Sequence, residues 1–228
     1  MKRFCPREGD KVTGACKENK VTEPVKRVYA FGKDAQGNNV TEGNTNMKAT
    51  LGGKGANLAE MANIGLPVPP GFTISCQTCM EYANAGNVWP EGVLDTIHEY
   101  RLDLEQRIGK KIGDAEDPLL VSVRSGAPMS MPGMMDTVLN LGLNDQSIHG
   151  LIKQTENPRF AWDSYRRFIQ MFSNVVMGLD GDLFENAINA MKAVRGVSSD
   201  TDLTAEDLQE LVGEFKGIFT ENVSGEKY

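Results

Sequence analysis

Cysteine, histidine and long apolar runs are scarce in this sequence. Its four cysteines are too few for a disulfide scaffold across 228 residues. No apolar run approaches the roughly 18 residues that a membrane-spanning helix requires. The N-terminus has no apolar core typical of a secretory signal, and its mixed charges are unlike an organelle transit peptide. We therefore expect a cytoplasmic protein with no membrane partner.

Aromatic residues and excess positive charge are lacking as well. Aromatic residues make up 7% of the chain, and the formal net charge is −7. Nucleic-acid-binding surfaces usually combine basic patches with aromatic platforms for the bases, so no nucleic-acid partner is expected. The hydrophobic content of 40% is that of an ordinary globular protein.

Cys76 and Cys79 form a C-x-x-C motif. The pair could be half of a zinc site, a redox pair, or two small residues packed where a strand meets a helix. A closed structural zinc site needs four ligands at characteristic spacing, and the sequence has no second C-x-x-C and only two histidines. Packing is the favoured interpretation, and no metal ligand is predicted in this chain.

Hydrophobic patterning predicts a helix-rich α+β fold with an all-helical subdomain in its C-terminal part. Residues 1–26 are polar and aperiodic, so we expect a mobile extension. Residues 27–143 mix strands with helices, whereas 144–228 carry only helical periodicity. The predicted strands are 26–32, 72–75 and 119–123, the last an apolar run typical of burial on both faces. Six helices are predicted. The first follows the glycines at 52–55, the second is 78–86 and the third lies within 91–110. The fourth begins at 158, the fifth is at about 183–194 and the sixth begins at 205.

Local signals mark several helix boundaries. Gly65 followed by Pro67 predicts the end of a helix whose apolar face is Leu58, Met61, Ala62 and Leu66. Two further signals predict helix starts: Asn157 before Pro158, and Thr204 with Asp207, which is close to a capping box.

Gly52, Gly53, Lys54 and Gly55 open the first of these helices. Glycines let successive backbone amides converge on an anion, the helix dipole adds to the attraction, and a lysine adds a point charge for phosphate. The spacing is not that of a P-loop. A plain turn with a solvated lysine explains the same residues, and spacing alone leaves both interpretations open.

Arg124 follows the apolar run and precedes a loop rich in glycine, proline and methionine. A buried strand that ends in arginine indicates an anion nearby, either a ligand or a structural carboxylate. The loop, Gly126 to Thr137, could cover a ligand or fill the core. Further along, Arg159, Asp163 and Arg167 have the spacing of a surface ion-pair ladder on one helix, which is the favoured interpretation there.

These signals occur together in segments that resemble the N-terminal region of the pyruvate, phosphate dikinase family. The segments are "LGGKGANLAEM", "GFTIS", "EDPLLVSVRSGAPMSMPGMMDTVLNLGLND" and "NPRFAWDSYRRFIQMFSNVVMG". The resemblance covers about residues 26–228. Phosphoenolpyruvate synthases share the VRS segment but lack the sequence at Ser130 to Thr137.

The resemblance implies an incomplete ATP-grasp-like domain that binds ATP with Mg²⁺ and continues beyond the chain end. Lys54 and Arg124 would hold ATP phosphates, Arg167 would be a further phosphate-side arginine, and Gly133 would belong to a mobile loop that closes on them. The magnesium ligands, the phosphohistidine and the site for pyruvate or phosphoenolpyruvate would lie outside this chain. Phosphate would be a further substrate, no catalytic residue is assigned here, and the full-length enzyme is expected to be a homo-oligomer.

Three alternatives stay open from the sequence. A related dikinase could use another acceptor, such as water or a glucan. A non-catalytic helical interaction module could retain the same sequence, and the cysteines could define a metal or redox module. Under the dikinase interpretation, we expect the chain alone to bind ATP weakly or undetectably and to be inactive.

Overall fold

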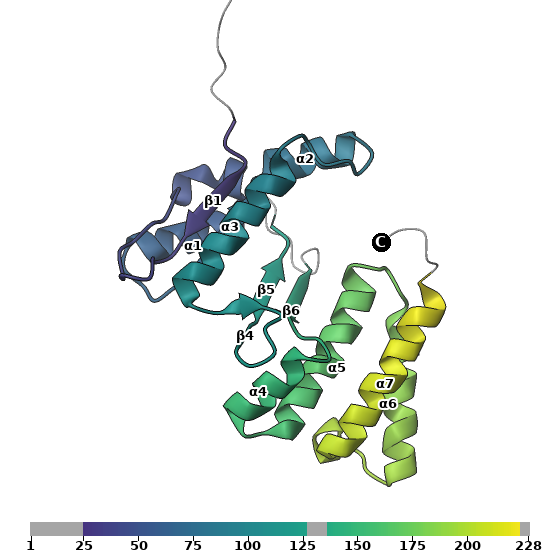
Figure 1. Cartoon of the computed structure of the whole chain (residues 1–228). Coiled ribbons are helices and arrows are strands. Elements are labelled where there is room, and N and C mark those ends of the chain that lie inside the picture. Colours follow the sequence, from purple (N-terminus) through teal and green to yellow (C-terminus); the bar gives the residue numbers. More distant parts are fainter. Residues whose placement is uncertain (1–24, 127–135, 224–228) are drawn as a thin grey trace, which may run out of the picture.

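A computed structural model of the chain describes residues 25–126 and 136–223 (Figure 1). Within these ranges the chain forms a helix-rich α+β fold with seven α-helices and three two-stranded sheets, which confirms the predicted α+β class. None of the helices in these ranges has both the length and the apolar character needed to cross a membrane. The predicted mobile extension falls almost wholly outside them, as does Gly133.

The first sheet organises the N-terminal half. Strands β1 (Val28–Phe31) and β2 (Gly71–Ile74) pair antiparallel, with Val28 opposite Ile74, and both confirm predicted strands. Helices α1 (Lys48–Asn63) and α3 (Val93–Ile108) pack on this pair, and α2 (Cys76–Asn84) follows β2. A 3₁₀ turn, η1 (Thr45–Met47), precedes α1.

Helix α1 is broken at Gly52, whose φ of 70° and ψ of 171° are not helical. One helical turn precedes this residue, and a longer helix follows it, as the glycine signal predicted. The predicted apolar face is right only in part: Ala62 is buried and Leu66 is 47% exposed, and the buried face is built from Ala56, Ala59 and Ala62. A Cβ atom at Gly55 would lie 2.9 Å from Thr73 Cγ2, so the helix lies too close to β2 for large side chains.

The C-terminal half combines short strands with a helical bundle. Strand β3 (Lys111–Ile112) runs parallel to β4 (Pro118–Leu119), and β5 (Val121–Arg124) runs antiparallel to β6 (Thr137–Leu141). Strand β6 packs on α5, and α5 also packs against α7. The helices are α4 (Ser147–Thr155), α5 (Pro158–Val175), α6 (Gly181–Arg195) and α7 (Ala205–Asn222), with a 3₁₀ turn η2 (Asp200–Asp202). Phe184, Leu208, Leu211 and Phe215 form the fully buried centre of this bundle.

The predicted burial of the 119–123 strand holds at its start, where Leu119 is 6% exposed, and fails at its end. The run divides into β4 and β5, and in β5 Val123 is 50% exposed while Ser122 and Arg124 are also exposed. Within the described ranges, β6 is the only strand paired with β5. A two-stranded ribbon does not cover both faces of a strand, so the apolar composition of this run does not bury Val123.

The predicted helix starts in the C-terminal half are confirmed. The Asn157 side chain accepts a hydrogen bond from the Phe160 amide at 3.0 Å and caps α5. Thr204 and Asp207 form a complete capping box at α7. Each signal is satisfied within four residues, so it does not depend on distant parts of the chain.

The segment that follows α3, residues 109–117 with β3 inside it, is fixed at both ends and joins α3 to the rest of the C-terminal half. On one side the buried Glu105 side chain of α3 accepts the Ile112 amide at 3.0 Å. On the other, α4 lies so close that a Cβ atom at Gly150 would be 2.6 Å from the Ala115 carbonyl oxygen. Asp114 also accepts the amides of Glu116 and Asp117, each at 2.9 Å, so the connection is internally braced.

Candidate functional site

Lys54 lies in the first turn of the helix that follows the Gly52 break. The first amides of a helix have no carbonyl partner one turn earlier within that helix, and the half-buried Lys54 stands in this turn. Among the described residues, no carboxylate lies within ion-pair distance of Lys54. The geometry suits an oxyanion such as a phosphate.

Arg124 is the last residue of β5 and pairs in register with Thr137 of β6. Its side chain is exposed, and its Nε donates to Ser122 Oγ at 3.2 Å. The next residue closes the base of the methionine-rich loop, because the Ser125 amide donates to the Asp136 carbonyl at 3.0 Å and Ser125 Oγ accepts the Asp136 amide at 2.8 Å. The guanidinium is thus held at the base of that loop. The methionines of the loop lie outside the described residues.

Arg166 and Arg167 are neighbours on α5 with different surroundings. Arg166 is 4% exposed, and its Nη2 donates to Asp163 Oδ1 at 2.7 Å and to Asp200 Oδ2 at 3.4 Å. The Arg167 side chain is 58% exposed and pairs with Asp163 Oδ2 at 3.0 Å. Arg166 is therefore structural, whereas Arg167 is open to solvent.

The predicted ion-pair ladder on α5 is half right. The step from Asp163 to Arg167 is confirmed, but Arg159 donates to the carbonyl oxygens of Leu203 and Asp200, both at 2.8 Å. The buried Arg166 takes the place of Arg159 beside Asp163. Sequence spacing did not show this, because the η2 turn that receives Arg159 is distant in the chain.

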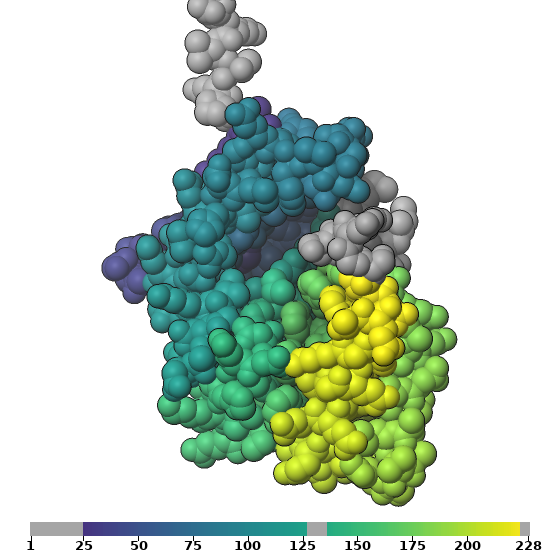
Figure 2. Space-filling view, turned by 45° about the vertical axis from the view of Figure 1, so that its right-hand side comes forward, coloured from purple at the N-terminus to yellow at the C-terminus, as the bar shows by residue number. Residues whose placement is uncertain are grey.

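The packing places the two arginines on linked elements. Arg124 is on β5, β5 pairs with β6, and β6 packs on the helix that carries Arg167. Lys54 belongs to the other half, where α1 packs with β1, β2 and α2. Figure 2 shows the purple and blue segments of the N-terminal half above the green and yellow segments of the C-terminal half. These contacts connect β5, which carries Arg124, to α5, which carries Arg167. They do not bring Lys54 to either arginine.

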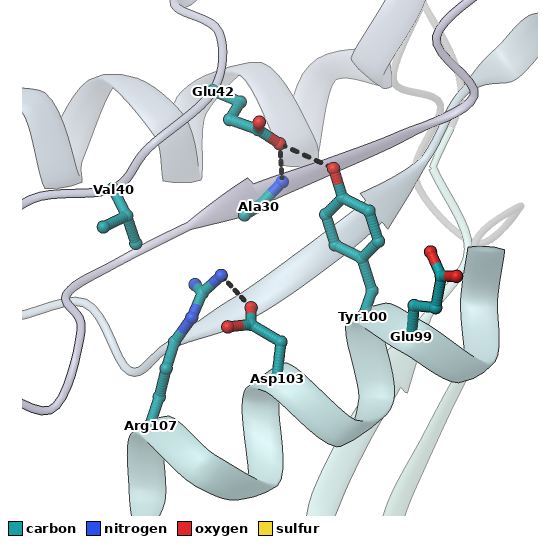
Figure 3. A pocket seen from close by; sticks show the side chains of 7 residues that line it. All are labelled: Ala30, Val40, Glu42, Glu99, Tyr100, Asp103 and Arg107. Carbon is teal, nitrogen blue, oxygen red and sulfur yellow. Dashed lines mark hydrogen bonds and ion pairs between the residues drawn. The ribbon is translucent and has the colours of Figure 1, made fainter.

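A pocket of about 280 Å³ lies between β1 and α3 (Figure 3). Glu42 lines this pocket and accepts the Ala30 amide at 2.7 Å, the Tyr100 hydroxyl at 3.0 Å and the Lys26 ammonium. Arg107 also lines the pocket; its side chain is largely buried and pairs with Asp103. Sequence reasoning missed this cluster, because Glu42 and Tyr100 are 58 residues apart with no shared motif. These polar groups satisfy one another, so the cluster joins α3 to β1.

Glu42 should stabilise the fold in a pH-dependent way. Burial alone would raise the pKa of Glu42, but its bonds with Lys26, the Ala30 amide and Tyr100 bring the pKa below its ordinary value of 4.5. The ionised form therefore favours the folded state above about pH 4.5, and this contribution is lost as the pH falls through the lower folded-state pKa. We expect Glu42→Gln to lower the free energy of unfolding at pH 7 by on the order of 1 kcal/mol, after allowance for partial exposure.

Urea unfolding of both proteins between pH 7 and pH 3 measures this difference. The two free energies should converge below pH 4.5, with Glu99→Gln at the edge of the same pocket as a control. A difference that stays constant down to pH 3 would show that the Glu42 charge is not what stabilises this joint.

The sequence of this chain is similar to known proteins. A family model described as the AMP/ATP-binding domain of pyruvate phosphate dikinase matches residues 48–101, which include Lys54. The pyruvate, phosphate dikinase of Clostridium symbiosum is 57% identical over 187 residues, 82% of this chain and 21% of that protein.

Two plant proteins show the same relationship. The chloroplastic pyruvate, phosphate dikinase of Flaveria pringlei is 53% identical over 208 residues, 91% of this chain and 21% of its own length. The chloroplastic pyruvate, phosphate dikinase 1 of Oryza sativa subsp. japonica is 55% identical over 196 residues, 86% of this chain and 20% of its own length. The chain thus spans about one fifth of the length of these relatives, and over that shared region it is similar to pyruvate, phosphate dikinases.

Proposed function

We propose that this chain is the ATP-binding part of a pyruvate, phosphate dikinase. Such an enzyme converts ATP, pyruvate and phosphate to AMP, phosphoenolpyruvate and diphosphate through a phosphohistidine, which we place outside this chain. The observation that carries the proposal is the match of residues 48–101 to an AMP/ATP-binding domain, within which Lys54 occupies the turn after Gly52. The names of the relatives favour pyruvate as acceptor over water or a glucan, and an enzyme over a helical interaction module.

In this proposal Lys54 and Arg124 hold phosphate oxygens of ATP, and Arg167 supplies further positive charge. Phosphoryl transfer depends mainly on positioning and on neutralising charge. Lys54 contributes a point charge beside helix amides, and Arg124 contributes a planar fork that can bind two oxygens at once. Gly133 is assigned to the loop that covers the phosphates, and the domain is assigned to the ATP-grasp-like folds.

Magnesium is the expected companion of ATP, and its contribution would be to bridge and neutralise phosphate oxygens. Among the described residues, no three histidine, cysteine or acidic side chains are grouped as a metal site would require. Magnesium bound to a nucleotide typically uses only one or two protein carboxylates, and we propose that these ligands lie outside this chain. The cytoplasmic location stays a prediction, because the two plant relatives are named as chloroplastic.

An ATP-derived lysine reagent tests the position of the phosphates. The assay uses a chimaera in which this chain replaces the matching fifth of the Clostridium symbiosum enzyme, so that the region keeps its neighbours. An adenosine triphosphopyridoxal reagent places an aldehyde at the end of the phosphate chain, where it forms an imine with an adjacent lysine that borohydride fixes. We expect peptide mass spectrometry to find Lys54 labelled, and excess ATP to prevent the labelling.

Lys48 is the matched control because it is exposed at the start of the same helix. It should react weakly and without protection by ATP. Equal labelling of Lys48 and Lys54, unaffected by ATP, would contradict the assignment of the phosphates to the Gly52 turn.

A further inference from the structure

The ribbon that carries Arg124 also holds the side chain of this arginine, through a neighbour on the same strand. Strands β5 and β6 lie side by side (Figure 1), and Arg124 is the last residue of β5. Successive side chains of a strand point to opposite faces, so Ser122 and Arg124, two residues apart, share one face. The Nε–H group of Arg124 donates to Ser122 Oγ at 3.2 Å. The guanidinium is thus tied to the strand by a donor that lies in its own plane.

The pairing of the ribbon is irregular opposite this serine. Val121 is opposite Leu141, whereas Val123, two residues on, is opposite Val138, three residues back along β6. Strand β6 therefore has an additional residue here, and Asn140 within this step has a φ of 59°, in the left-handed region. A bulge of this kind bends a strand, raises its local twist and can re-aim a side chain. The ribbon is thus distorted at the position that holds the guanidinium.

The backbone of Arg124 is fixed on its other side as well. Arg124 is paired in register with Thr137. The Ser125 amide donates to the Asp136 carbonyl at 3.0 Å, and Ser125 Oγ accepts the Asp136 amide at 2.8 Å. With the backbone held, the freedom that remains to Arg124 is that of its long side chain, which has a large rotamer entropy. The bond to Ser122 restricts that freedom.

The bond from Nε leaves the far end of the guanidinium open. Arginine has one N–H donor on Nε and a pair on each Nη atom. The Nη atoms of Arg124 make no hydrogen bond to any residue that the structure describes. An oxyanion can therefore accept one N–H group from each Nη atom, which is a paired contact along the end of the fork. The edge that includes Nε is occupied by the serine and is not available for such a contact.

We propose that Ser122 is a positioning residue for Arg124, and that it holds the guanidinium with both Nη atoms toward the phosphate oxygens. This inference rests on the proposed function, because it requires ATP phosphates at Arg124. Ser122 acts through the arginine and does not touch the ligand. It removes in advance part of the side-chain freedom that ATP binding would otherwise have to remove, and such preorganisation strengthens binding. Its effect therefore belongs to the binding step, since bound ATP itself orders the arginine.

Ser122→Ala in the Clostridium symbiosum chimaera tests this role through the rate of phosphoenzyme formation at varied ATP concentration. We expect KM for ATP to rise roughly fivefold, the factor for loss of one typical hydrogen bond, with the maximal rate within about twofold of the original. Ser122→Thr keeps the hydroxyl and suits a strand, so it should retain the original KM. A lower maximal rate with unchanged KM would show that the serine only supports the ribbon, and would overturn the inference.

Two variants of Arg124 separate this inference from the proposed function. Arg124→Ala should impair phosphoenzyme formation severely, and a near-normal rate would contradict the phosphate role of Arg124 and the inference with it. Impaired Arg124→Ala together with an unchanged KM in Ser122→Ala would overturn the positioning role alone. Lysine has no Nε–H group for the serine to accept, so Ser122→Ala should not raise KM further in an Arg124→Lys background. An equal rise in both backgrounds would show that Ser122 does not act through Arg124.

Discussion

Lys54→Ala should slow phosphorylation by ATP about a hundredfold in the Clostridium symbiosum chimaera, because removal of one charged transition-state contact typically costs about 3 kcal/mol. The lysine sits among helix amides, and no carboxylate of the described residues neutralises it. Its charge is therefore available to a phosphate. The measurement is the single-turnover rate at which the protein takes up label from β-labelled ATP in the presence of phosphate.

Two variants separate the loss of a contact from damage to the helix. Lys48→Ala removes an exposed lysine from the same helix and should leave the rate within about twofold, since substitutions of exposed residues have small effects. Lys54→Arg keeps the charge and should recover part of the rate. Transfer of the phosphoryl group from the phosphoenzyme to pyruvate should be spared in all three variants. A near-normal rate for Lys54→Ala would remove this residue from the site.

Arg166→Ala should lower the free energy of unfolding by about 3 to 5 kcal/mol, the range found when one partner of a buried ion pair is removed. Arg166 is 4% exposed, and it bonds Asp163 on its own helix and Asp200 on η2. Without it, the Asp163 carboxylate stays largely buried with less compensation. Urea unfolding followed by circular dichroism measures the loss.

The adjacent Arg167 provides the matched comparison. Arg167→Ala removes the same side chain from the next position, but there it is 58% exposed, so the change should be within about 1 kcal/mol. Arg166→Met should lose less than Arg166→Ala, because methionine refills the volume without restoring the charge. Equal losses for Arg166→Ala and Arg167→Ala would show that the cluster on α5 contributes no specific stability.

Features set by local chemistry could be predicted from the sequence, whereas features set by distant partners could not. The caps at Asn157 and Thr204 are each satisfied within four residues, so the local sequence is enough to predict them. The exposure of Val123 depends on which strands pair with β5, and an apolar run does not record that. Strand β6 was not predicted, because it follows directly from a loop and no turn signal marks its start.

The candidate site divides along the same line. Lys54 and Arg124 stand in compact motifs, and the structure describes each as a cation with no carboxylate partner among the described residues. Their roles toward phosphate stay predictions. The different surroundings of Arg166 and Arg167 could not be read from helical spacing, because Asp200 approaches from another part of the chain. Gly133 lies outside the described residues, so its assignment depends on the resemblance alone.

The braced connection at residues 109–117 has a consequence for binding strength. Lys54 belongs to one half of the chain and Arg124 to the other, and Glu105 and Gly150 fix the connection between them. A ligand that touched both cations would be bivalent, and after its first contact the second would depend on an effective concentration set by this short tether. If the connection holds Lys54 and Arg124 at a separation that matches the ligand, the effective concentration is high; if the separation does not match, it is nearly zero. Affinity for a triphosphate would then be set in part by residues that never touch it.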